Sequence, residues 1–81
     1  GQKETDMGNL LSYYAAYSPA FTTQRTKGTV IMLNAFSEKI ILDKSKVLKE
    51  MRFAFKHMEK RRKCFDVKRA EGWLRGFEKE V

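Results

Sequence analysis

The sequence predicts a small α+β domain. Its expected elements are a short N-terminal helix, a three-stranded antiparallel sheet arranged as a meander, and two C-terminal helices, the first strongly basic. Three observations predict this order: helical spacing of apolar side chains near the N-terminus, β-prone runs in the middle, and two amphipathic stripes near the end. With 81 residues the chain has the length of one domain. We expect residues 7–81 to form it and residues 1–6 to be a disordered or tag-derived tail.

The first expected element is a helix from about residue 7 to residue 17. Asp6 is a suitable N-cap, and Leu10 and Tyr13 begin a series of apolar side chains at helical spacing. Pro19 disfavours helical geometry in the residue before it, so the helix should end there.

The middle of the chain is expected to form the sheet. Residues 20–23 are β-prone, and the β-branched run TVIML at 29–33 follows after a five-residue loop. The apolar run at 40–42 supplies the third strand. An alternative leaves out the first strand, so that 30–36 pairs only with 39–42.

Two amphipathic helices are expected to follow, over residues 44–62 and 67–80. Asp43 or Ser45 can cap the first helix, and Asp66 can cap the second. The apolar stripe of the first helix is interrupted at Arg62, which favours a break over one long helix with a phase shift. The first stripe consists of Val47, Leu48, Met51, Phe55 and Met58. The second consists of Val67, Ala70, Leu74, Phe77 and Val81.

Two glycines lie four residues apart in the second of these helices. Gly72 and Gly76 therefore fall on one helix face. Each costs about 1 kcal/mol of helix propensity relative to alanine. We expect this cost to be offset by close packing of another backbone against that face.

Positive charge is concentrated in the last part of the chain. The net charge is +7. Residues 1–44 hold five Lys or Arg and four Asp or Glu, whereas residues 45–81 hold twelve and six. This asymmetry predicts an anionic partner, most often nucleic acid, either DNA or RNA. No apolar run is long enough to cross a bilayer, and a membrane partner is not expected.

The first C-terminal helix carries a basic stripe opposite its apolar face. On a helical wheel with Met51 at 0°, five cations fall between about 100° and 180°. They are Lys49, Arg52, Lys56, Lys60 and Lys63, and further positive charge follows at Arg61, Arg62 and Arg69. We predict that these residues contact phosphates. The alternative is a solvated lysine-rich surface without a ligand.

Phe53 raises a separate question, because it falls beside the basic stripe and away from the core. The C-terminal helix could cover it, or it could be buried in a protein partner or a homodimer. It could also stack on a nucleic-acid base or insert into a groove. With its neighbour His57, Phe53 is therefore the candidate partner-binding residue.

The sequence gives little support for catalysis. His57 is the only histidine and lies on the polar half of its helix, where no partner for a general base can be assigned. Cys64 is the only cysteine, so there is no internal disulfide and no zinc framework. We expect a non-enzymatic protein without cofactor or metal. A free thiol is typical of an intracellular protein, cytoplasmic or nuclear.

Overall fold

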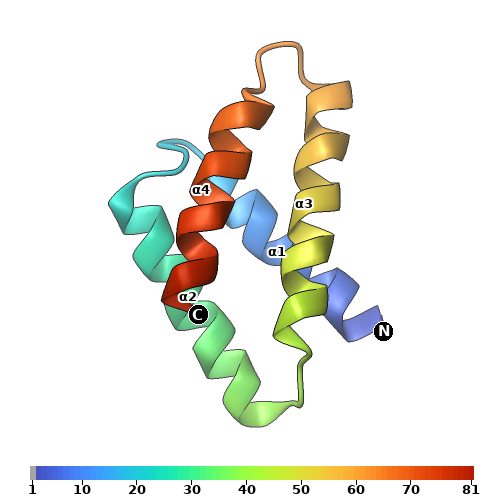
Figure 1. Ribbon diagram of the computed structural model, residues 1–81, viewed down its shortest axis with the longest axis vertical. Helices are drawn as coiled ribbons and strands as arrows, with labels where there is room; N and C mark the ends of the chain where they lie inside the picture. Colours follow the sequence, from blue (N-terminus) through green and yellow to red (C-terminus); the bar gives the residue numbers. More distant parts are fainter. Residues whose placement is uncertain (1) are drawn as a thin grey trace.

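The computed structural model describes residues 2–81 and contains four α-helices (Figure 1). They are α1 (Gln2–Ala16), α2 (Thr23–Lys39), α3 (Lys44–Arg61) and α4 (Val67–Glu80). No strand occurs among residues 2–81, and 80% of the structure is helical. The prediction of a three-stranded sheet is therefore wrong, and the domain is all-α.

Residues 29–33, expected to form the second strand, lie within the continuous helix α2, whereas residues 20–23, expected to form the first, are the turn that leads into this helix and the first residue of the helix. Thr22 caps it, and its side chain accepts a hydrogen bond from the Arg25 N–H at 3.3 Å. Thr29 and Leu33 lie on the buried face of this helix. The preference of β-branched residues for strands is small and depends on context, so tertiary packing can override it. The remaining expected strand, 40–42, is an irregular connection to α3.

Hydroxyl groups make the buried face of α2 look polar in the sequence. The side chains of Thr26, Thr29 and Ser37 each donate to the carbonyl oxygen four residues earlier, at 3.1, 2.7 and 2.7 Å. These bonds satisfy the hydroxyls inside the helix itself. The helical periodicity is therefore present, but it is carried partly by residues that a hydrophobic pattern does not count.

The N-terminal segment also differs from the expectation. Gly1 lies outside the described residues, whereas residues 2–6, expected to belong to a disordered tail, form the first turns of α1. Glu4 is buried there, and its Oε2 accepts a hydrogen bond from the Asp43 N–H at 3.1 Å. This bond connects the start of α1 to the residue that caps α3.

The two C-terminal helices begin and end close to the expected positions. Asp43 caps α3 and Asp66 caps α4, and each side chain accepts from the backbone N–H three residues later. Residues 62–66 form the turn between them, so that α3 and α4 lie side by side (Figure 1).

The core lies where α1 crosses behind α3 and where α4 packs beside it (Figure 1). Phe55 lies at its centre, with Phe21 and Trp73 packed against it at ring-centroid distances of 5.7 and 6.2 Å. Trp73 also donates from Nε1 to Thr26 Oγ1 at 2.7 Å, which joins α4 to α2. The buried cluster comprises Met7, Leu11, Ala15, Leu33, Val47, Met51, Phe55, Met58, Ala70, Leu74 and Phe77.

Close backbone packing occurs at a different glycine from those expected. A Cβ atom added at Gly8 of α1 would lie 2.6 Å from Glu50 Cβ and 3.2 Å from the Met51 nitrogen of α3. Gly72 and Gly76 have open space at the same position. The expectation of close packing at those two glycines is therefore wrong. Within residues 2–81, no helix has the length and hydrophobicity needed to cross a membrane.

Candidate nucleic-acid interface

The exposed face of α3 presents the cations that the sequence singles out. We call this face the basic crest, defined by Lys49, Arg52, Lys56 and Lys60, all of which are exposed. Their spacing of three or four residues places them in one row along the helix. The row runs for about 16 Å at 1.5 Å per residue.

The members of the basic crest differ in their neighbours. Arg52 Nη2 lies 3.2 Å from Glu78 Oε1 of α4, in an exposed ion pair. Lys49, Lys56 and Lys60 form no ion pair with any residue of the described chain, 2–81. Three cations of the crest are therefore available to an external anion without breaking an internal contact.

Carboxylates border the basic crest on both sides. Glu59, Glu71 and Glu78 lie on the side of α4. On the side of α1, Glu50 accepts a hydrogen bond from Thr5 Oγ1 at 2.9 Å, next to the buried Glu4. Carboxylates therefore flank the row of cations along α3 and separate it from exposed cations of α4, including Lys68, Arg75 and Lys79.

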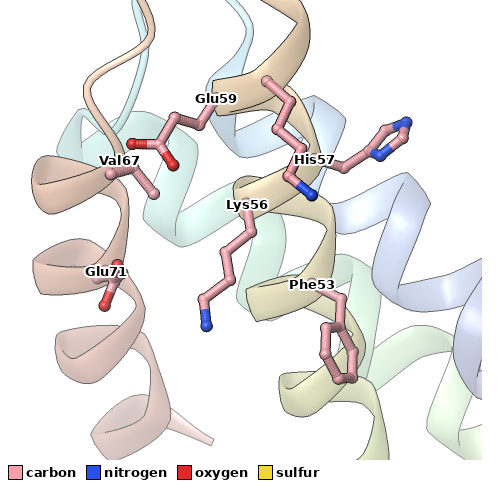
Figure 2. A pocket seen from close by; sticks show the side chains of 7 residues that line it. Phe53, Lys56, His57, Glu59, Val67 and Glu71 are labelled. Carbon is pink, nitrogen blue, oxygen red and sulfur yellow. The ribbon is translucent and has the colours of Figure 1, made fainter.

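An open hollow of about 460 Å³ lies between the crest and α4 (Figure 2). Figure 2 shows Lys56 pointing into the space between the two helices, where Val67 and Glu71 form the opposite wall, while His57 points away from α4. Two further hollows, of about 320 and 250 Å³, lie on the side of α1. Phe53 lines all three hollows.

Phe53 is 56% exposed. The interpretation in which α4 covers it is therefore wrong. The apolar ring stands on the basic crest, with Lys49 one turn before it and Lys56 one turn after it. Burial by a partner molecule or contact with a base remain as predictions.

The other predicted cations lie around the turn between α3 and α4. Arg61 is the last residue of α3, and Arg62 caps it, with its N–H donating to the Met58 carbonyl at 2.8 Å. Lys63 lies beyond the helix end, so its expected place in the stripe is wrong. All three are exposed.

The side chain of Arg69 in α4 contacts other residues of the domain and so contributes to the fold. Its Nη2 donates to the Ala20 carbonyl at 3.1 Å, and its guanidinium carbon lies 5.7 Å from the centroid of the Phe21 ring. Arg69 thus holds the segment that links α1 to α2. Among the predicted phosphate-binding residues, Arg69 resembles a free surface cation least, because its guanidinium group contacts a backbone carbonyl and an aromatic ring of the same domain.

Lys46 lies next to the basic crest but is not among the residues predicted to bind phosphates. It is exposed, lies on the first turn of α3 and lines a hollow with Lys49 and Phe53. The three- and four-residue spacing of 46, 49 and 53 is the signal that could have identified it. The bordering carboxylates of α4 carry no such signal, because they approach α3 only in the folded chain.

The residues that could support catalysis or metal binding are scattered. His57 and Cys64 are both exposed. Nowhere in residues 2–81 do three or more His, Cys, Asp or Glu side chains come together in a way that could hold a metal ion. The site therefore consists of a row of cations, the exposed ring of Phe53 and open hollows, one of which is also lined by Tyr13.

Comparisons with protein-family models, with curated proteins and with solved structures find no match for this chain.

Proposed function

We propose that the protein is a non-enzymatic nucleic-acid-binding module that contacts phosphates through the basic crest. One observation carries the proposal: Lys49, Lys56 and Lys60 are exposed in a single row, and within residues 2–81 they have no anionic partner. A row of unpaired cations on one helix face attracts an external polyanion without first breaking an internal ion pair.

The mechanism is charge neutralisation with release of counterions from the nucleic acid. The crest offers lysine ammonium groups, which bind phosphates as point charges and carry little base information. Arg61, Arg62 and Lys63 add positive charge at one end of the row. Binding should therefore be strongly dependent on salt and weakly dependent on sequence.

A salt titration tests the proposal. With three to five phosphates neutralised, log K should fall with log salt at a slope of about −2 to −3.5 for single strands and about −3 to −4.5 for a duplex. Fluorescence anisotropy with labelled DNA and RNA oligonucleotides measures this slope. An affinity that stays constant as salt increases, or no binding at low salt, would contradict the proposal.

The exposure of Phe53 favours one alternative, a protein-interaction module such as a small regulator, an inhibitor or a complex subunit. In that case Phe53 and the surrounding cations bind an acidic protein surface or a second copy of the chain. Sedimentation analysis of the Phe53→Ala variant tests the self-association form of this alternative. Loss of a dimer together with unchanged nucleic-acid affinity would favour it over the first proposal.

A further inference from the structure

We infer that the basic crest takes single-stranded nucleic acid, with one base stacked on Phe53. This inference rests on the proposed function and names the class of ligand for the same site. It follows from the carboxylates that flank the row of cations, from the helices that flank α3 and from the exposure of one aromatic ring.

The first argument is the row of cations with its flanking carboxylates. Lys49, Lys56 and Lys60 form one row, and carboxylates stand on both sides of it: Glu59 and Glu71 toward α4, and Glu50 toward α1. A single strand presents one row of phosphates to such a row of cations. A duplex presents two backbones, and the carboxylates beside the row repel a second backbone that lies directly next to it.

The second argument is steric. The major groove is about 12 Å wide and admits one α-helix of about 10–12 Å diameter. Both α1 and α4 contact α3, and hollows line the crest toward each of them. The surface around the crest is therefore broader than one helix, so α3 does not project from the domain as an isolated helix that fills a groove. A flexible single strand needs no such projecting helix.

The third argument is the ring of Phe53. It is a helical turn away from Lys49 on one side and from Lys56 on the other, about 6 and 4.5 Å along the axis. The hollows of about 460 and 250 Å³ beside it leave room for a planar group next to the ring. An aromatic ring among cations is the arrangement that binds single strands, because any base can stack on it while the cations hold the backbone.

The test compares one labelled mixed-sequence oligonucleotide, single or annealed to its complement, in anisotropy titrations at fixed salt. Phe53→Ala should weaken single-strand binding by about 5- to 150-fold, the range expected for loss of one base–aromatic stack. Duplex binding should change by less than about twofold, because only phosphate contacts remain there. Phe36→Ala, at an exposed phenylalanine of α2, is the matched control and should change neither.

Two further variants separate stacking from simple apolar contact. Phe53→Trp should retain single-strand affinity, whereas Phe53→Leu, which keeps an apolar side chain without a ring, should lose it. Phe53→Leu also serves if Phe53→Ala does not fold, and circular dichroism checks each variant.

The outcomes distinguish the two proposals. If the wild type binds duplex as tightly as single strand, and neither Phe53→Ala nor Phe53→Leu weakens single-strand binding, the inference is overturned while the proposed function stands. If the wild type binds neither form, both are overturned.

Discussion

At the scale of single residues, Glu4 is the most informative position in the structure. It is 4% exposed, and its carboxylate accepts a hydrogen bond from the backbone N–H of Asp43, the residue that caps α3. This hydrogen bond to the charged carboxylate is the largest cause that lowers the pKa of Glu4 from 4.5 to about 2. The stability of the fold should therefore depend on pH in the acidic range.

The direction of this dependence follows from proton binding. Because the pKa of Glu4 is lower in the folded state, its stabilisation is fully present above about pH 4.5 and is lost as pH falls toward about 2. Glu4→Gln removes the titrating group and should flatten the decline of the free energy of unfolding in this window. Urea unfolding at several pH values measures it, with Glu38→Gln on α2 as a control for the loss of one negative charge.

Parallel pH profiles of the wild type and Glu4→Gln between pH 4.5 and 2 would contradict the assigned role of Glu4.

Two phenylalanines of α3, two positions apart, show what the sequence can predict about single residues and what it cannot. The helical wheel assigns Phe55 to the core and Phe53 to the polar face, and the structure agrees for both. The wheel could not decide whether α4 covers Phe53, because that depends on how two helices meet.

At the scale of elements, the C-terminal helices were predictable and α2 was not. In α3 the apolar positions coincide with the buried face, and Asp43 and Asp66 are strong caps. In α2 the buried face includes Thr26 and Thr29, whose hydroxyls are satisfied by backbone carbonyls within the helix. A run of β-branched residues whose buried positions are partly polar has the sequence pattern of a strand. Only the packing of the neighbouring helices shows that it is helical.

The crossing of α1 and α3 supplies a test at this scale. Gly8→Ala would place a methyl group 2.6 Å from Glu50 Cβ, so the helices must separate. The cost of overpacking, about 1–3 kcal/mol, exceeds the gain of about 1 kcal/mol in helix propensity. We expect the free energy of unfolding to fall by up to about 2 kcal/mol in urea denaturation.

Gly72→Ala is the matched control, because a Cβ atom at Gly72 meets open space. It should stabilise the protein by up to about 1 kcal/mol through helix propensity alone. Equal stabilisation by both substitutions would mean that α1 and α3 do not cross as closely as described.

At the scale of the whole molecule, the fold places part of an uneven charge distribution in one exposed row of cations. The sequence places most of the positive charge after residue 44, and the structure exposes part of it as the basic crest. The carboxylates of α4 flank this row, and Arg52 is partly neutralised by Glu78. Such cross-helix neighbours could not be inferred from spacing, because they are far apart in the chain.

The claim that the basic crest binds nucleic acid is tested most directly by two double charge reversals with the same change in net charge. Lys56→Glu with Lys60→Glu alters the crest, whereas Lys27→Glu with Lys39→Glu alters exposed lysines of α2. In salt-dependent anisotropy titrations with a labelled single strand, we expect the crest variant to lose at least about tenfold in affinity and about 1.4 in salt slope. The α2 variant should keep the wild-type slope. Equal losses in the two variants, or no loss in the crest variant, would contradict the claim.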